Sequence, residues 1–493
     1  MIAKSSLKYS IIICCCFILM FPARDAAQTQ SFVPAWVKDA IFYQIFPERF
    51  ANGDTTNDPP NVERWGAAPK VNNYFGGDLK GVIDHLDYLQ NLGINAIYFT
   101  PIFESPSNHK YHTADYMKID HNFGDDETFK KLLRECHKRN IRIVIDGVFN
   151  HTGVKFFAFE DIKKNEQNSR YLKWFNVHSF PVGPPEKPNY EAWWGLGDLP
   201  KLMTGNPEVR SYLFDATKKW TQMGLDGWRL DVPNEIPHDF WIEWRKLVKS
   251  INPDAYIVGE IWDDASAWLQ GDQFDAVMNY RFRGACVGFI ALENQKASQF
   301  DSILAVQRSQ YPEEVNYVLQ NLIGSHDTER YLTLSNGDDD KLKLSVLMQM
   351  TYPGAPMVYY GDEIGMEGGR DPDCRKTMIW DSTKWNAGLL ECYKKLIRIR
   401  NDYPVLRRGS FRTVLIDDKR KLYGFQREDG KQTAAVVLNN FPMQQKIPTS
   451  MFKTPVSGWT DLLGNTILSP AGDSLTIPAR SGIILIHKSA TNK

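Results

Sequence analysis

The sequence has few cysteines and no excess of charge of either sign, and each absence excludes a class of protein. Seven of the 493 residues are cysteine, and three of them, Cys14, Cys15 and Cys16, lie close to the N-terminus. The other four are scattered without the spacing of a disulfide framework or a zinc site, so we expect neither. Lysine plus arginine (58) balances aspartate plus glutamate (59). No global field therefore recruits nucleic acid or an anionic membrane, and we expect an uncharged substrate.

The chain also lacks an apolar run long enough to cross a membrane. The longest one near the N-terminus, Ile11 to Phe21, has eleven residues and follows Lys4 and Lys8. As a helix it would span about half of a hydrocarbon layer roughly 30 Å thick, which argues against a membrane anchor. The pattern is typical of a secretory signal peptide, which we predict over residues 1–27. We therefore expect export to the periplasm or the medium, and no membrane span in the mature chain.

Short apolar runs alternate with helical segments from Ala40 onward, and a hydrophobic content of 43% is enough for a large core. Strands that are apolar throughout and separated by helices indicate a parallel sheet buried on both faces, and eight of them suggest a closed barrel. We predict a (β/α)8 TIM barrel over residues 32–152 and 200–401. The runs are "AIFYQ" from Ala40, "INAIYFTP" from Ile94, "IRIVID" from Ile141, "LDGWRLD" from Leu225, "YIVGE" from Tyr256, "DAVMNY" from Asp275, "LIGSHD" from Leu322 and "PMVYYGD" from Pro356.

Two parts of the chain depart from this alternation. Residues 153–199 contain "PVGPPEKP" and "WWGLGD" without sustained helical periodicity, so we predict an inserted domain after the third strand. Residues 402–493 contain β-type runs joined by the Asp429-Gly430 turn, and we predict a C-terminal antiparallel β-sandwich there.

Four carboxyl groups, Asp146, Asp231, Glu260 and Asp327, follow predicted strands at the barrel face that carries active sites. Retaining glycoside hydrolysis needs two carboxyl groups about 5–5.5 Å apart, one as nucleophile and one as proton donor. Asp231 and Glu260 end neighbouring strands, so this pairing is geometrically easy. Arg229 points to the same side as Asp231 and would keep it ionised, while the charge of Asp231 would raise the pKa of Glu260.

The strings around these residues resemble the four ordered motifs of the α-amylase superfamily. They are "DGVFNH" from Asp146, "GWRLD" from Gly227, "GEIW" from Gly259 and "GSHD" from Gly324. The resemblance implies that Asp231 is the nucleophile, Glu260 the acid/base and Asp327 a third carboxylate that binds sugar hydroxyls. It also implies the substrate-binding residues Asp146, His151, Arg229 and His326, with His109 and Tyr111 at the glycone sugar and Asp371 and Arg375 at the next one.

Other strings are similar to the neopullulanase and cyclomaltodextrinase branch: "LPKLM" from Leu199, "DVPNE" from Asp231 and "YYGDEIGMEGGRDPDCRKTMIWD" from Tyr359. That branch cleaves α-1,4 bonds in maltooligosaccharides, starch, pullulan or cyclodextrins, sometimes with α-1,6 cleavage or glucosyl transfer. By this resemblance Glu235 shapes the aglycone side; a helix N-terminal acid is the alternative. The branch usually has an N-terminal β-domain that builds a dimer, whereas here the barrel begins just after the leader, so we expect a monomer. His112 replaces a usual acidic residue, and we expect altered hydrogen bonding in its loop.

Oxygen donors cluster in "NGDTTND" from Asn52 and "GGD" from Gly76. Calcium accepts carboxylate, amide and carbonyl oxygens in flexible geometry, and the strings also resemble the calcium loop of the branch. The alternative is an ordinary turn rich in Asp and Asn. We predict a structural Ca²⁺ held by Asn52, Asp54, Asn57, Asp58, the carbonyl of Gly76, and Asp78.

Three alternatives to a hydrolase stay open. A glucan transglycosylase or transferase would use the same triad, because water and sugar acceptors share one covalent intermediate. A non-catalytic binding protein on this scaffold is disfavoured by the presence of all three carboxylates. Specificity for sucrose or isomaltose-type substrates is opposed only by the strings that resemble the branch.

Overall fold

The structure, a computed structural model, describes residues 31–452, 458–464, 466–467 and 474–488. The predicted leader, residues 1–27, lies outside these ranges. No helix within them combines the length and the apolar character that crossing a bilayer would need.

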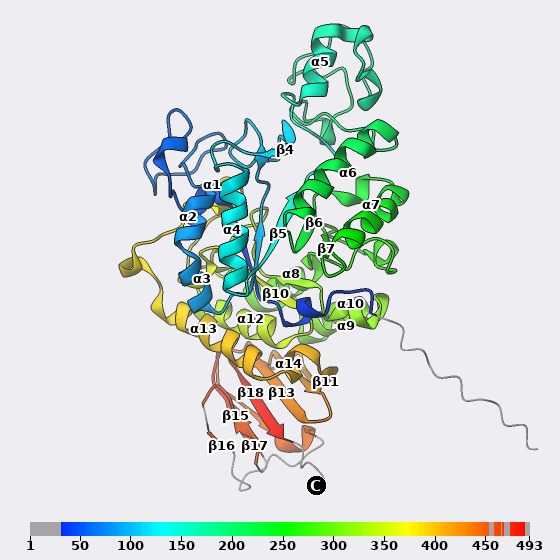
Figure 1. The fold of residues 1–493 in the computed structure, drawn as a ribbon. Helices are drawn as coiled ribbons and strands as arrows, with labels where there is room; N and C mark the ends of the chain where they lie inside the picture. The colour runs from blue at the N-terminus through cyan, green and yellow to red at the C-terminus, as the bar shows by residue number, and fades with distance from the viewer. Residues whose placement is uncertain (1–30, 453–457, 465, 468–473, 489–493) are drawn as a thin grey trace, which may run out of the picture. The chain divides into compact units, whose positions relative to one another are not determined.

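Eight parallel strands form the centre of the fold (Figure 1). They follow the order β8-β7-β6-β5-β2-β1-β10-β9, and a parallel bridge from Met278, beside β8, to Gln320 of β9 nearly closes the barrel. The predicted barrel is confirmed, although its seventh strand ends at Leu322 rather than beginning there. The strands are β1 (Phe42–Ile45), β2 (Ala96–Phe99), β5 (Arg142–Gly147), β6 (Gly227–Leu230), β7 (Tyr256–Gly259), β8 (Ala276–Val277), β9 (Gln320–Leu322) and β10 (Ala355–Tyr359).

Helices surround this barrel, and the amphipathic ones bury an apolar stripe against it. In α4, a stripe of Phe129, Leu132, Leu133 and Cys136 is buried, and the side chain of Asp125 caps the helix by accepting a hydrogen bond from the Thr128 amide. The longer helices are α4 (Asp126–Lys138), α6 (Pro207–Gln222), α7 (His238–Ile251), α9 (Ala297–Gln310), α12 (Asp339–Thr351) and α13 (Ala387–Asp402).

A long segment lies between β5 and α6 and contains the short helix α5 (Phe157–Asn165). In Figure 1 this helix lies beyond α6, away from the barrel strands. The sequence did not predict α5, because its nine residues are too few for a sustained periodic pattern. An isolated bridge between His151 and Lys201 ties the two ends of the segment together beside β5.

The C-terminal part consists of antiparallel strands, as the sequence predicts. Its main sheet has the order β11-β12-β13-β18-β15-β16, and β14 pairs with β17 separately. The Asp429-Gly430 turn joins β12 to β13, and Gly430 adopts the positive φ of 81° that this turn requires. The strands are β11 (Ser410–Asp417), β12 (Leu422–Glu428), β13 (Gln432–Asn439), β14 (Gln445–Pro448), β15 (Thr460–Asp461), β16 (Thr466–Ile467), β17 (Ser474–Ile477) and β18 (Ser481–Lys488).

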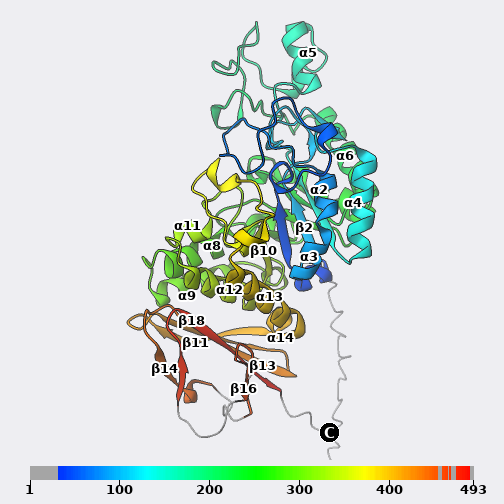
Figure 2. The same ribbon diagram turned by 90° about the vertical axis from the view of Figure 1, so that its left-hand side faces the viewer.

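One buried arginine joins this sheet to the barrel helices. The guanidinium of Arg427, on β12, donates hydrogen bonds to the carbonyls of Thr351 at 2.8 Å and Gly409 at 2.8 Å. Burial lowers the pKa of Arg427 to about 10. In Figure 2 the C-terminal strands accordingly lie next to α9, α12 and α14 (Val405–Arg408).

Candidate active site

The register of neighbouring strands brings three of the predicted carboxyl groups together. Asp146 of β5 pairs with Arg229 of β6, so the two side chains leave the sheet side by side. Leu230 pairs with Gly259, and each is followed directly by a predicted catalytic residue, Asp231 or Glu260. Parallel pairing therefore places Asp231 and Glu260 at the same edge of the barrel.

Arg229 is fully buried and contacts all three of these carboxyl groups. Its Nη1 lies 2.9 Å from Asp231 Oδ1 and 2.9 Å from both oxygens of Asp146. Its Nη2 lies 2.6 Å from Glu260 Oε2. The sequence predicted the contact with Asp231 but not the shared guanidinium, which gives three acids a single positive partner.

Burial of the acidic groups favours their protonated forms. Burial raises the pKa of Glu260 to about 7, and the acidic neighbours Asp327 and Asp146 add to the shift, while Arg229 and the indole N–H of Trp262 oppose it. Burial also raises the pKa of Asp231 well above its ordinary value; Arg229 lowers it but does not outweigh burial, as the sequence prediction of an ionised Asp231 assumed. The sequence attributes the high pKa of Glu260 to the charge of Asp231; in the structure burial is the largest cause, and the acidic neighbours that add to it are Asp327 and Asp146.

A cavity of about 620 Å³ opens at this edge of the barrel, and it is lined by most of the predicted site. Asp146, Arg229 and His326 are buried and do not line it, so they support the residues that do. The predicted residues at the cavity wall are His109, Tyr111, His151, Asp231, Glu235, Glu260, Asp327, Asp371 and Arg375.

Behind the wall, His326 joins the two sides of the site. Its Nε2 lies 2.6 Å from the Tyr111 hydroxyl and 3.2 Å from Asp327 Oδ2, and its ring stacks on Tyr111 with an interplanar angle of 3°. The Tyr111 hydroxyl also donates to Asp146 Oδ2 at 3.0 Å. Burial lowers the pKa of His326 well below its ordinary value, so the neutral ring acts as a hydrogen-bonding spacer.

Two buried polar atoms of the cavity have no hydrogen-bond partner among the residues that the structure describes. They are Asp231 Oδ2 and His151 Nε2, which lie 4.0 Å apart. Burial lowers the pKa of His151 to about 3, so its ring is neutral. Buried polar groups are rarely left unpaired, and this pair offers a ready place for a hydroxyl group.

On the opposite side, the predicted pair Asp371 and Arg375 forms an ion pair of 3.0 Å. Arg375 also donates to Asp327 Oδ1 at 3.2 Å and to the carbonyl of His326 at 2.9 Å. His109 lies in the same wall, where its Nδ1 accepts a hydrogen bond of 3.2 Å from the amide of Tyr111. Asp371, Arg375 and Asp327 therefore form one connected group, and His109 is held to Tyr111.

Glu235 connects the barrel to the inserted segment. Its carboxylate accepts a hydrogen bond of 3.0 Å from the indole of Trp193 and one of 3.1 Å from Lys201. It is the last residue of the short 3-10 helix Pro233–Glu235, and α7 begins only at His238 without a side-chain cap. The contacts with the inserted segment, rather than a helix terminus, occupy this carboxylate.

Aromatic residues that the sequence did not assign also line the cavity. Trp193 stacks on His151 at 5.3 Å and on Trp194 at 4.5 Å, and Trp194 is 80% exposed. Trp262 stacks on Tyr280 at 3.6 Å and donates a hydrogen bond of 3.2 Å to Glu260. The signal was present in "WWGLGD" and "GEIW", but a tryptophan in a sequence is as often part of a core.

Val232, directly after Asp231, has an unusual backbone. Its φ of 42° lies in the left-handed region, which a β-branched residue rarely adopts. Such strain persists where the surroundings impose it, and here it turns the chain sharply at the end of β6.

His112 also lines the cavity. Its carbonyl accepts a hydrogen bond of 2.9 Å from the Ser105 hydroxyl, and burial lowers the pKa of the His112 ring.

Only some of the predicted calcium ligands lie close to one another. Asn52 donates to Asp58 at 2.7 Å, and both lie against Gly76, whose φ is +80°. Asn52 Oδ1 and Asn57 Oδ1 are buried without a hydrogen-bond partner in the described part of the chain. By contrast, Asp54 caps a turn at Thr56, and Asp78 accepts backbone hydrogen bonds from Gly53, Asp54 and Gly81.

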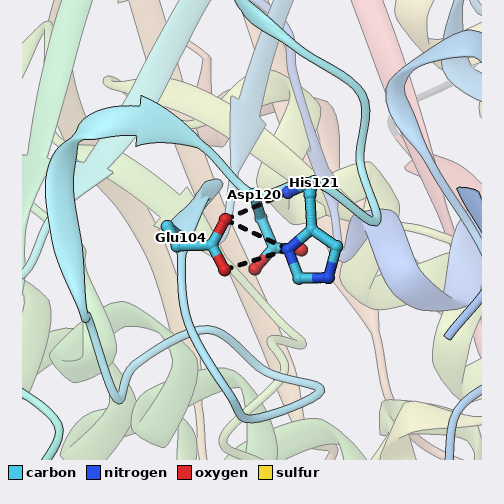
Figure 3. A group of neighbouring side chains, drawn as sticks. All are labelled: Glu104, Asp120 and His121. Carbon is cyan, nitrogen blue, oxygen red and sulfur yellow. Dashed lines mark hydrogen bonds and ion pairs between the residues drawn. The ribbon is translucent and has the colours of Figure 1, made fainter. Parts of the chain in front are cut away.

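A separate group with metal-ligating side chains consists of Glu104, Asp120 and His121 (Figure 3). His121 Nδ1 lies 2.9 Å from Glu104, at the surface. Asp120 is buried and already neutralised by Lys110 at 2.8 Å. A hydrogen bond between His121 and Glu104 and an ion pair between Asp120 and Lys110 therefore account for the group.

The chain is similar to known proteins in sequence and in fold. A family model described as "Alpha amylase, catalytic domain" matches residues 44–408. Neopullulanase 2 of Thermoactinomyces vulgaris is 52% identical over 460 residues, which cover 92% of this chain and 78% of that protein. A solved cyclomaltodextrinase superposes with a TM-score of 0.88 at 45% identity, covering 92% of this chain and 79% of that one. Cyclic α-maltosyl-(1→6)-maltose hydrolase of Arthrobacter globiformis gives a TM-score of 0.87 at 42% identity, covering 92% and 100%.

The prediction of export is contradicted by the name of a close relative. An "Intracellular maltogenic amylase" of Bacillus subtilis is 44% identical over 414 residues, 83% of this chain and 70% of that protein, and this points away from export. The prediction depended on the composition of residues 1–27, which lie outside the described residues. A short apolar run after two lysines is a compositional pattern, and it does not by itself establish cleavage.

Proposed function

Because the chain belongs to the alpha-amylase family, as a neopullulanase/cyclomaltodextrinase-like glycoside hydrolase, we propose that it cleaves α-1,4-glucosidic bonds with retention of configuration. The observation that carries this proposal is the free oxygen of Asp231. Asp231 Oδ2 is buried in the wall of the cavity without a hydrogen-bond partner among the described residues, while Oδ1 is held by Arg229 at 2.9 Å. A carboxylate fixed through one oxygen presents the other to an anomeric carbon.

In the first step Asp231 Oδ2 forms a bond to the anomeric carbon, and the bond from that carbon to the glycosidic oxygen breaks. Glu260 donates its proton to the leaving oxygen. In the second step a water molecule attacks the same carbon, its proton passes to Glu260, and the bond to Asp231 breaks. Three acids around one guanidinium retain a proton, and a pKa of about 7 suits Glu260 to hold it.

The surrounding residues support binding of a sugar at this point. Asp327 is partly exposed, with 29% of its side chain accessible, and is oriented by Arg375 and His326, so it can accept hydrogen bonds from sugar hydroxyls. Tyr111 and Trp262 offer aromatic surfaces in the same cavity. We propose maltooligosaccharides, pullulan, starch and cyclodextrins as the substrate group, with cleavage of α-1,4 bonds and also of α-1,6 bonds. The names neopullulanase and cyclomaltodextrinase of two relatives support pullulan and cyclodextrins.

We also propose a structural Ca²⁺ in the loop of Asn52, Asn57, Asp58 and Gly76. The unpaired amide oxygens of Asn52 and Asn57 support it, since calcium binds oxygen donors of this kind. Asp54 and Asp78 also belong to the predicted ligand set, although their carboxylates accept hydrogen bonds from the chain. The ion would tie the loop to the start of α2 (Leu79–Asp84), and no step of the reaction depends on it.

Replacing Asp231 by Asn tests the proposed chemistry. Asn retains the shape but lacks the nucleophilic charge, so we expect turnover of maltotriose to fall by at least about 10⁴-fold with glucan binding retained. A matched control is Asp226→Asn, since Asp226 lies before the same strand, at its other end, where it pairs with Arg142 at 2.8 Å. Turnover by Asp231→Asn within tenfold of the parent would exclude the proposal.

Product analysis separates the hydrolase from the transferase that uses the same residues. Incubation with maltotriose should yield mainly maltose and glucose; mainly longer oligosaccharides would identify a transferase. With pullulan, release of panose would support cleavage of α-1,4 bonds of the neopullulanase type. β-Cyclodextrin and starch in the same assay would rank the substrates.

A further inference from the structure

A second cavity of about 690 Å³ lies outside the active site and is comparable to it in size. Its walls come from two segments, the loop of residues 65–69 and the stretch from Gly365 to Lys384. Trp65 and Trp380 both line it, on opposite segments. Concave sites with aromatic walls and a few polar groups are where small ligands bind.

The two cavities share one stretch of chain. Asp371 and Arg375 line the active-site cavity, whereas the interleaved Asp373, Lys376 and Thr377 line the second one. Lys376 directly follows Arg375, so neighbouring side chains leave this stretch toward different cavities. A ligand in the second cavity would therefore lie next to the active site without entering it.

Backbone contacts hold Trp65 in place. Its indole N–H donates a hydrogen bond of 2.9 Å to the carbonyl of Met378, and the amide of Gly66 donates one of 3.1 Å to Thr377. Trp380 is fixed in the same way, through a hydrogen bond of 2.6 Å to the carbonyl of Phe50. The Trp380 ring already packs against His85, with the ring centroids 3.7 Å apart. The ring surface of Trp65 is therefore the one left for a ligand, and such surfaces stack on the apolar faces of sugars.

The charges of this cavity disfavour an anionic ligand, because its two lysines are paired and its wall also carries Glu367. Lys376 pairs with Asp373 at 3.0 Å, and Lys384 pairs with Asp381 at 3.5 Å. Both lysines of the wall thus have carboxylate partners, which leaves no unpaired ammonium group there for an anion. The paired groups still have hydrogen-bonding capacity for hydroxyl groups.

We propose that this cavity is a second, non-catalytic binding site for a linear α-glucan, with Trp65 as its principal stacking surface. The choice of an α-glucan rests on the proposed function, because the active site next to it is assigned to the same ligand class. The site would hold a longer chain beside the catalytic cavity or bind a separate oligosaccharide.

Equilibrium dialysis with labelled maltotetraose tests this proposal. In the Glu260→Gln variant, which retains the active-site cavity but lacks the acid, we expect two maltotetraose molecules per chain. Adding Trp65→Ala should reduce this to one. Ala68→Leu, which fills the cavity from an exposed position without touching these hydrogen bonds, should do the same if the alanine variant fails to fold.

Trp268→Ala is the matched control, because Trp268 is a partly exposed tryptophan that lines neither cavity. It should still bind two molecules, and with Glu260 present both cavity variants should turn over maltotriose within twofold of the parent. One molecule per Glu260→Gln chain, or two in both cavity variants, would overturn the second site. No binding together with no turnover by the parent would instead overturn the proposed function, and this site with it.

Discussion

His151 Nε2 faces Asp231 Oδ2 across 4.0 Å, and neither atom has another polar partner among the residues that the structure describes. The gap is too wide for a hydrogen bond but fits a hydroxyl group that contacts both atoms. A sugar bound here would satisfy two buried groups at once, beside the oxygen that we assign to attack.

Replacing His151 by Phe should test this contact. Phe preserves the stacking on Trp193 but removes the ring nitrogens, so we expect kcat/KM on maltotriose to fall about 10- to 100-fold. The pKa of about 3 keeps His151 neutral, so the loss should be equal at pH 5 and pH 7. His121→Phe, at the exposed Glu104 cluster, should have no effect; a loss that disappears at one of the two pH values would contradict the neutral role.

Trp262 offers a test of Glu260 as the acid. Glu260 acts while protonated and its pKa is about 7, so kcat/KM should decrease as the pH rises through about 7. The indole N–H of Trp262 lowers that pKa through its hydrogen bond. Trp262→Phe preserves a ring against Tyr280 and removes the N–H, so the alkaline limb should move to higher pH. A limb that stays in place or moves down would refute this assignment, and Trp268→Phe serves as the control.

The contact between Glu235 and Trp193 predicts a binding effect. Glu235→Ala removes the acceptor for Trp193 and Lys201, so the aromatic wall of the cavity loses its anchor. We expect KM on maltotriose to rise about fivefold, the equivalent of about 1 kcal/mol, with a smaller change in kcat. Glu208→Ala removes a similar bond of 2.9 Å, to Trp174, away from the cavity and should leave KM unchanged. Equal effects of the two variants would indicate a general loss of stability.

Calcium should be visible in thermal unfolding. Adding Ca²⁺ to chelator-treated protein should raise Tm, because an ion that binds only the folded state adds about 2.7 kcal/mol at a hundredfold excess over Kd. Asn57→Leu should abolish the rise, since its unpaired oxygen is a proposed ligand. Glu104→Gln, at the other cluster, should not. An unchanged response in Asn57→Leu would remove this loop from consideration.

The sequence predicted the barrel because its strands are short, apolar and regularly separated. It also predicted nine residues of the cavity wall. Asp231, Glu260 and Asp327 follow strand ends that must meet at one face, whereas the resemblance to the family supplied the other six. What it missed depends on contacts across long separations. Glu235 and Trp193 lie 42 residues apart, and only the folded inserted segment brings them together.

The sequence also did not predict the local side-chain and backbone geometry of the site. The sharing of Arg229 among three carboxyl groups follows from the pairing of β5, β6 and β7, which a motif does not specify. The left-handed backbone of Val232 contradicts the preference of its residue type, so propensity predicts the opposite. The sequence did not predict the second cavity because Trp65 and Trp380, which both line it, are far apart in the chain.

The burial of Glu260 beside Asp327 and Asp146 makes folding a proton-binding reaction, which Arg229 only partly offsets. In the unfolded chain Glu260 has a pKa near 4.5, whereas in the folded chain the value is about 7. Between these two values the unfolded glutamate has released its proton and the folded one retains it, so folding takes a proton up from the solvent. This group therefore weakens the folded state as the pH rises from about 4.5 to about 7, and the full cost remains above that range. The burial that keeps Glu260 protonated near neutral pH therefore also makes the folded barrel less stable there.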